Sequence, residues 1–215
     1  MSGAGDHAAL WPRLPENTHE YVRELLAALS VDLRLSRPRR SKLGDHRPPT
    51  AARRRHRISV NEDLNPYAFL TTLLHELAHA ATWDLHGRRS RRVRPHGPEW
   101  KAQFARILEP VVAGRLVPTD IGAALERSLR NPAAATCSDR GLLLALARYD
   151  TADPGLVFVE TLPPGTTFRT DTGRLYRLGP RLRSRFLCVE QGTGREYRLH
   201  PLCRVAAVGD RPPPS

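Results

Sequence analysis

Lysine is almost absent from this 215-residue chain: Lys42 and Lys101 stand among 34 basic residues, and all the others are arginine. Such a skew, together with 19 prolines, indicates a compositional bias toward arginine as the basic residue. Bias does not explain why 34 basic residues face only 22 acidic ones, which leaves a formal net charge of +12. A strongly basic chain favours a polyanionic partner, so we expect a nucleic acid to be one.

Cysteine is scarce and long apolar runs are missing. Cys137, Cys188 and Cys203 are too scattered for a disulfide framework. The densest apolar stretch, residues 142–146, is far shorter than the roughly eighteen residues of a membrane helix. Residues 1–7 lack the basic start and apolar segment of a secretory signal. We therefore expect no membrane partner and a cytoplasmic location, while the oligomeric state is unknown from the sequence.

The feature that carries chemistry is the run His75-Glu76-Leu77-Ala78-His79, which reads His-Glu-x-x-His. On a helix this spacing places two imidazoles one turn apart on the same face. Both can bind one zinc ion, and the glutamate between them can take a proton from the attacking water. Asn65 as a cap and Pro66 at the first helical position predict where that helix begins.

The helical periodicity separates an apolar face of this segment from the histidine face. At about 100° per residue, one stripe consists of Leu70, Leu73, Leu74, Leu77 and Ala81. The two histidines fall roughly opposite, so the leucines can anchor the helix in a core while the histidines face a cleft. The alternative is a half-exposed helix whose polar face happens to read His-Glu-His.

A catalytic zinc normally takes three protein ligands and keeps one open position, so a third ligand is needed. His86 would share the helical face but lie about 10 Å further along the axis. Glu99 could complete a site of two histidines and one glutamate. His96 precedes Pro98, which suits a first helical position and leaves His96 on the incoming loop. We favour His96 as the third ligand over Glu99 and His86.

Residues 69–81, followed by His96-Gly97-Pro98-Glu99-Trp100-Lys101, resemble the SprT-like (Spartan-type) zinc metallopeptidase family. Residues 57–64 are similar to the strand and loop that precede the metal helix there, and the resemblance covers approximately residues 17–130. It implies His75, His79 and His96 as the ligands of one Zn²⁺ ion per chain and Glu76 as the catalytic acid/base. It further implies a protease that cleaves proteins bound or crosslinked to DNA and so acts in DNA repair. Many members carry a Cys-x-x-Cys zinc ribbon that this chain lacks.

Arginines crowd the loop between the metal helix and the third histidine, at positions Arg88, Arg89, Arg91, Arg92 and Arg94. The planar guanidinium fork binds two phosphate oxygens at once. Because these side chains abut the expected cleft, we assign nucleic-acid binding to them, with DNA that is single-stranded or has single-stranded character as the partner beside the protein substrates. The alternative is a solvated loop of mutually repelling charges.

The fold class expected is α+β: a zincin-like metalloprotease domain with the His-Glu-x-x-His helix, followed by a small all-β barrel of SH3-like or OB-like type. Helices are predicted at 16–29, 98–112, 119–129 and 141–149. Strands are predicted at 31–35 and 56–60, with a flexible arginine- and proline-rich connection between them. Six further strands, separated by turn signals, are predicted at 156–160, 166–169, 174–178, 185–189, 196–199 and 205–208.

These elements suggest a division of the chain into five parts. They are a flexible N-terminus (1–15), the SprT-like metalloprotease domain (16–132), a helical linker (133–153), the small β-barrel domain (154–209) and a tail (210–215). Within the barrel region, Cys188, His200 and Cys203 have no Cys-x-x-Cys pair and are weak candidates for a second zinc site.

Overall fold

The structure is a computed structural model that describes residues 9–39, 42–87, 93–130, 139–151 and 155–208. The chain divides into two compact units, residues 1–150 and 151–215, each with its own core. The five-part division expected from the sequence remains a prediction. In the described part of the chain, no helix is both long and apolar enough to cross a membrane.

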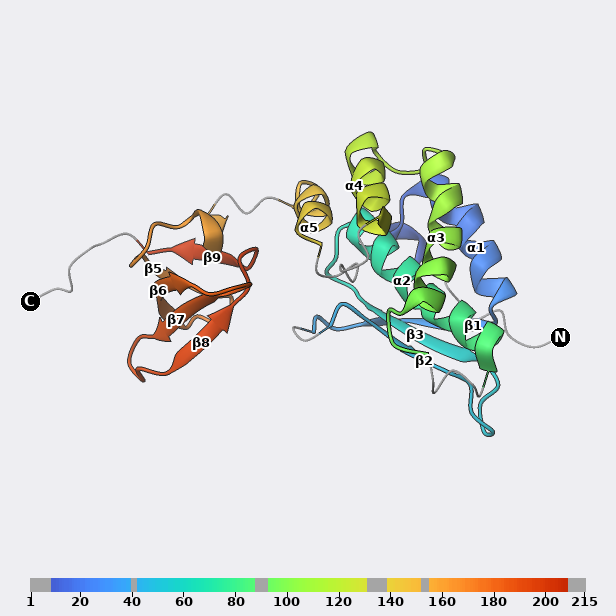
Figure 1. The fold of residues 1–215 in the computed structure, drawn as a ribbon, viewed down its shortest axis with the longest axis horizontal. Helices are drawn as coiled ribbons and strands as arrows, with labels where there is room; N and C mark the ends of the chain where they lie inside the picture. The colour runs from blue at the N-terminus through green and yellow to red at the C-terminus, as the bar shows by residue number, and fades with distance from the viewer. Residues whose placement is uncertain (1–8, 40–41, 88–92, 131–138, 152–154, 209–215) are drawn as a thin grey trace, which may run out of the picture. The chain divides into compact units, whose positions relative to one another are not determined.

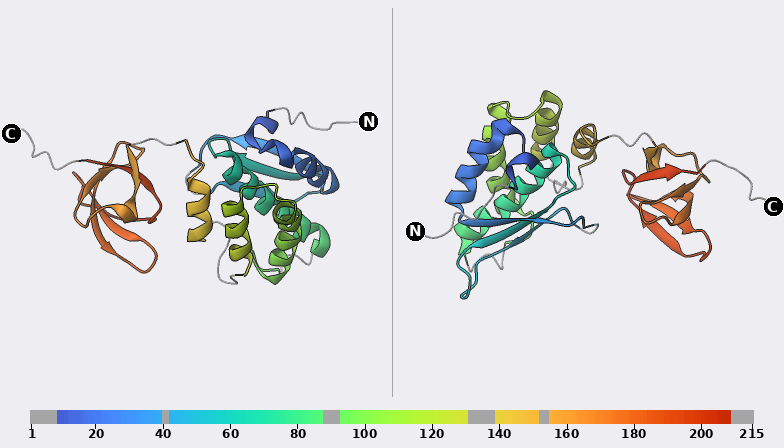
Figure 2. Two further views of the ribbon diagram at one scale, coloured as in Figure 1. Left: turned by 90° about the horizontal axis from the view of Figure 1, so that it is seen from above. Right: turned by 180° about the vertical axis from the view of Figure 1, so that it is seen from behind.

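The first unit has mixed α+β architecture, with helices gathered on one face of a three-stranded sheet (Figures 1 and 2). Its helices are α1 (His19–Ala28), α2 (Pro66–His86), α3 (Pro98–Ala113), α4 (Thr119–Arg130) and α5 (Arg140–Ala147). Its strands are β1 (Val31–Ser36), β2 (Gly44–Arg47) and β3 (His56–Asn61). All five helices, together with strands β1 and β3, lie within a few residues of their predicted positions.

Strand β2 lies where the sequence predicted only a flexible connection. The sheet order is β1-β3-β2, with β1 parallel and β2 antiparallel to β3. Gly44 and His46 pair with buried Val60 and Ile58, which places them on the helix side of the sheet. The prediction failed here because Gly-Asp-His-Arg shows no apolar alternation, so that only pairing with β3 makes it a strand.

Helix α2 runs through the centre of the first unit. Asn65 caps it, because its side chain accepts hydrogen bonds from the backbone N–H groups of Tyr67 (3.0 Å) and Ala68 (2.9 Å). The helix ends at Gly87, whose φ of 52° lies in the left-handed region that glycine favours. The predicted apolar stripe is buried throughout: it consists of Leu70, Leu73, Leu74, Leu77 and Ala81. This anchoring makes α2 a rigid platform.

The second unit is a six-stranded antiparallel sheet in the order β4-β9-β5-β6-β7-β8. Its strands are β4 (Leu156–Phe158), β5 (Thr167–Arg169), β6 (Leu175–Arg181), β7 (Phe186–Glu190), β8 (Glu196–Leu199) and β9 (Arg204–Ala207). Among the described residues no pairing joins β4 to β8, so the sheet does not close there and the predicted small SH3-like or OB-like barrel is not confirmed. Strand β4 is only three residues long and passes into a 3-10 turn at Val159–Thr161, which ends its edge early.

Candidate metal centre and catalytic cleft

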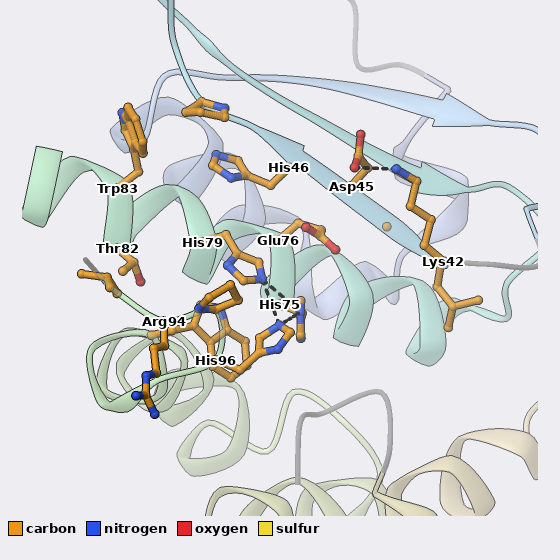
Figure 3. Close-up of a pocket in the computed structure, with 16 residues that line it drawn as sticks. Lys42, Asp45, His46, His75, Glu76, His79, Thr82, Trp83, Arg94 and His96 are labelled. Carbon is orange, nitrogen blue, oxygen red and sulfur yellow. Dashed lines mark hydrogen bonds and ion pairs between the residues drawn. The ribbon is translucent and has the colours of Figure 1, made fainter. Parts of the chain in front are cut away.

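Three histidine side chains meet at one point of the first unit (Figure 3). His75 and His79 project from one face of α2, and His96 reaches them from the loop before α3. Their Nε2 atoms are 3.2 Å (His75–His79), 3.1 Å (His79–His96) and 3.0 Å (His75–His96) apart. These separations are close to those of nitrogens that all lie about 2.0 Å from one zinc ion.

The protonation of these rings fits a metal better than a hydrogen-bonded cluster. Burial, followed by the neighbouring imidazoles, lowers the pKa of His75 to about 3 and that of His79 to about 4. Burial also lowers the pKa of His96. Neutral imidazole is the form that binds metal, and one nitrogen carries either a proton or a lone pair. Three mutually close Nε2 atoms therefore cannot all be satisfied by one another, whereas a single cation satisfies all three.

The backbone at His96 is what turns its side chain back toward α2. His96 has a φ of 59°, in the left-handed region that non-glycine residues rarely adopt. A turn closed by the Gly97 N–H and the Arg94 carbonyl (2.8 Å) holds this conformation, and Pro98 starts α3 directly afterwards. His96 thus lies on the incoming loop, where the sequence placed it.

The two alternative third ligands are not part of this cluster. Across the described residues, the His75, His79 and His96 group is the only set of three or more potential ligands whose atoms converge. Neither Glu99 nor His86 joins it. By the same criterion, Cys188, His200 and Cys203 do not form a second site. The assignment of the three histidines as ligands stays a prediction that this geometry supports.

Trp100, in the first turn of α3, forms a wall behind the histidines. Its ring centroid lies 4.7 Å from those of His75 and His96 and 5.4 Å from that of His79. The side chain is buried, and it stacks on Phe104 at 4.8 Å. The sequence analysis named Trp100 only as part of the segment His96–Lys101 and gave it no role, since nothing in its spacing predicts contact with α2. Trp100 thus packs against the rings of all three histidines.

Glu76 lies beside the histidines and faces β2 rather than solvent. It is 8% exposed, and burial, followed by the charge of Asp45, raises its pKa to about 7; Arg39 and Lys42 act in the opposite direction. Its neighbour across the gap is the backbone of Gly44. A Cβ atom at Gly44 would lie 2.5 Å from Glu76 Oε1 and 2.8 Å from its Cγ. Only glycine leaves room for the carboxylate here.

A cleft of about 630 Å³ gives access to the histidines and to Glu76. Its walls are helix α2, the segment 93–96 and strand β2 with its preceding residues, as Figure 3 shows. Arg94 is one of the lining residues. The other arginines to which the sequence analysis assigned nucleic-acid binding lie outside the described residues: Arg88, Arg89, Arg91 and Arg92.

His46 belongs to the cleft wall and was missed by the sequence analysis, because it lies in the unpredicted strand β2. Its Nε2 is 2.8 Å from His56 Nδ1, and His56 Nε2 is 2.9 Å from Asp84 Oδ1. Because a carboxylate only accepts, His56 donates to Asp84 and His46 donates to His56. His46 Nδ1 is then left as an acceptor, and its ring stacks on His79 with centroids 6.2 Å apart.

The comparisons with known proteins bear on the first unit. A family model described as the SprT-like family matches residues 13–120, half of the chain, which includes β1 to β3, α2, α3 and all three histidines. No curated protein and no solved structure matches the chain. At the level of the family, the match supports a metalloprotease-like function. The chain belongs to the SprT-like family.

Proposed function

We propose that this protein is a zinc-dependent endopeptidase that acts on proteins bound or crosslinked to DNA. The observation that carries the peptidase part is the convergence of three neutral imidazoles beside a buried glutamate in an open cleft. His75, His79 and His96 would hold the zinc ion, and Glu76 would be the catalytic acid/base. Membership of the SprT-like family supports this zincin-type arrangement.

When bound, zinc would act as a Lewis acid that polarises the scissile carbonyl and makes water more acidic. Glu76 would take the proton from the attacking water and deliver it to the leaving amine. In the metal-free protein burial raises the pKa of its carboxyl to about 7, close to the range in which a general acid/base is most effective near neutral pH. Trp100 would keep the imidazoles oriented, and β2 would limit the movement of Glu76 through its contact at Gly44.

The DNA part of the proposal rests on charge. The chain carries a net charge of +12, and Arg94 lines the cleft that contains the catalytic groups. Guanidinium groups at this place can bring the cleft to protein lodged on a phosphate backbone. Selection of substrates by location would then replace a deep specificity pocket.

The test is zinc content together with cleavage of a DNA-bound protein, with and without single-stranded DNA, for wild type, Glu76→Gln and Glu99→Gln. We expect one zinc per chain in all three, and cleavage stimulated by DNA in wild type and Glu99→Gln only. Zinc without cleavage under any condition would favour a DNA-binding protein with a structural zinc. A chain that binds no zinc would contradict the enzyme altogether.

The ligand set is tested separately with His96→Ala and Glu99→Gln. Loss of zinc in His96→Ala, with retention in Glu99→Gln, is expected from the convergence of the histidines. The reverse result would assign the third position to Glu99 and a different type of zinc hydrolase to the chain.

A further inference from the structure

The face of the first sheet that points away from the helices is polar and rich in arginine. Along β3, Ile58 and Val60 are buried on the helix side, so Arg57 and Ser59 point to the opposite face. The same alternation and the strand register place Arg34 of β1 and Arg47 of β2 on that face. We call this surface the outer arginine face.

The arginines on this face repel one another. Arg47 and Arg57 are directly opposite in the antiparallel β2–β3 ladder, and like charges in that position destabilise a sheet. Desolvation, followed by the charges of Arg53, Arg47 and Arg34, lowers the pKa of Arg57, although the charge of Asp45 acts in the opposite direction. This repulsion lowers the stability of the free protein, and an anion that binds between the guanidinium groups would reduce it.

The acidic side chains of this face neutralise only part of its charge. Asp32 is held by Arg55 at 2.5 Å. Asp45 is held by Lys42 at 2.6 Å, and Arg47 reaches it at 3.1 Å. In the described part of the chain, the guanidinium groups of Arg34 and Arg57 have no ion-pair partner. These two arginines are therefore available to an external anion.

A hollow of about 140 Å³ lies among these side chains. Its lining consists of Arg34, Arg39, Asp45, Arg47, Arg57, Ile58 and Ser59. Arg39 is fixed in place, because it donates to Ser59 Oγ (3.1 Å), the Ser59 carbonyl (3.3 Å) and Asn61 Oδ1 (2.9 Å). The hollow is large enough for a phosphate group, and part of its charge is preorganised.

We propose that the outer arginine face binds the phosphodiester backbone of a nucleic acid, with one phosphate in the hollow between Arg34 and Arg57. None of the described residues that line this hollow is aromatic, so it would contact the backbone without stacking on bases, and binding would be independent of sequence. The described large apolar side chains that are exposed, Leu85, Leu156 and Val157, lie on other elements, which disfavours an apolar partner here. The proposal deepens the DNA part of the proposed function and adds a surface on the other face of the sheet, where Asp45 lines both the hollow and the cleft.

The test measures binding of a fluorescent single-stranded 20-nucleotide DNA to full-length Glu76→Gln protein over a range of salt concentrations. The variant is Arg34→Gln/Arg57→Gln, and the matched control is Arg115→Gln/Arg127→Gln, which removes two exposed arginines from elsewhere in the same unit. We expect the variant to bind about tenfold more weakly and the slope of log affinity against log salt to fall by about 0.7, as for one lost phosphate contact with a single strand. The control variant should show a smaller change in both the affinity and the salt slope.

Equal weakening by both variants would overturn the proposal, because net charge rather than this face would then control binding. The same assay with RNA and with duplex DNA of matching sequence identifies which nucleic acid supplies the phosphates. Loss of binding to phosphatidylserine vesicles, with DNA binding kept, would assign the face to an anionic lipid surface and overturn the proposal as well.

This assay uses a variant without the catalytic carboxylate, so its result does not depend on peptidase activity. Suppose that the wild-type protein shows no cleavage, while Arg34→Gln/Arg57→Gln binds DNA more weakly. The peptidase proposal would then be wrong, and the assignment of DNA binding to the outer arginine face would be supported. If wild type cleaves and the variant keeps its DNA affinity, the reverse holds. Thermal unfolding of both double variants confirms that each is folded.

Discussion

At the residue scale, the carboxylate of Glu76 lies against the backbone of β2 rather than in open solvent. Gly44 supplies the contact, and the absence of its Cβ leaves the space that the carboxylate occupies. On the other side, the imidazole of His75 packs against Trp100. The position of the catalytic group thus depends on a strand and a helix that contribute no catalytic atom themselves.

Gly44→Ala should displace Glu76 and lower kcat for peptide cleavage by about 10- to 100-fold, because a shift of about 1 Å at a catalytic group has effects of that size. Zinc content should be unchanged, since the three histidines are not in the way of the new methyl group. The matched control is Gly122→Ala in α4, whose Cβ would have only an ordinary contact of 3.9 Å with Val117. Full activity of Gly44→Ala would show that Glu76 does not need this position.

At the scale of elements, helix α2 is tied to α5 at its N-terminus. Besides capping α2, the Asn65 amide donates to the Leu146 carbonyl (3.0 Å) and to Asp150 Oδ1 (2.5 Å). Helix α5 is also tied to α4, because Asp120 accepts hydrogen bonds from Tyr149 (2.9 Å) and Arg148 (3.3 Å). These contacts fix the start of the helix that carries two of the three histidines.

Asn65→Ala should lower the free energy of unfolding by about 1–2 kcal/mol through the lost cap, with a further loss from the contacts to α5. Asn65→Ser, which keeps a capping oxygen, should lose less. Urea unfolding of the first unit, followed by tryptophan fluorescence, measures both. An unchanged midpoint in Asn65→Ala would mean that the cap contributes nothing in this context.

The Asp120 contact predicts a pH dependence of stability. The hydrogen bond from Tyr149, and the smaller contributions of the Ile121 N–H and Arg148, lower the pKa of Asp120 below its ordinary value, although partial desolvation opposes them. A carboxyl whose folded-state pKa is lowered stabilises the fold above its unfolded pKa of about 3.9 and loses that contribution as the pH falls through the folded value.

The stability of wild type should therefore exceed that of Asp120→Asn at neutral pH, and the difference should begin to shrink as the pH falls to about 3.9 and continue to shrink below it. Urea midpoints between pH 3 and pH 7 measure the difference. A constant gap across that range would show that the ionisation of Asp120 is not responsible.

At the scale of the whole molecule, the chain contains two compact units with separate hydrophobic cores, and the candidate metal centre lies entirely within the first. A ligand stabilises only the unit whose folded state binds it. We therefore expect metal binding to raise the stability of the first unit and to leave the stability of the second unit unchanged.

Removal of zinc with a chelator should lower the unfolding temperature of the first unit and leave that of the second unchanged. At a free zinc concentration 1,000 times the dissociation constant, the linked stabilisation is about 4 kcal/mol. Differential scanning calorimetry with and without zinc measures the shift, and His96→Ala, which lacks a ligand, should show little of it. A single transition that moves as a whole would contradict the independence of the two cores.

Much of the site could be predicted because its signals are local. The motif from His75 to His79, the cap at Asn65 and the proline that starts α3 are each readable within a few residues, since helical periodicity and capping act over one turn. The positions of most strands followed from period-two patterns and turn residues for the same reason.

What the sequence by itself determined is therefore the helix that presents His75, Glu76 and His79, and the loop position of His96. Only the tertiary structure decided that His96 Nε2 lies 3.0 Å from His75 Nε2 and that β2 places Gly44 and His46 against α2. It also decided that no pairing among the described residues closes the second sheet. The physical reason is that these features depend on pairing and packing between residues far apart in the chain. A backbone turn at His96 and a strand without apolar alternation acquire their form from those partners, and no local pattern encodes them.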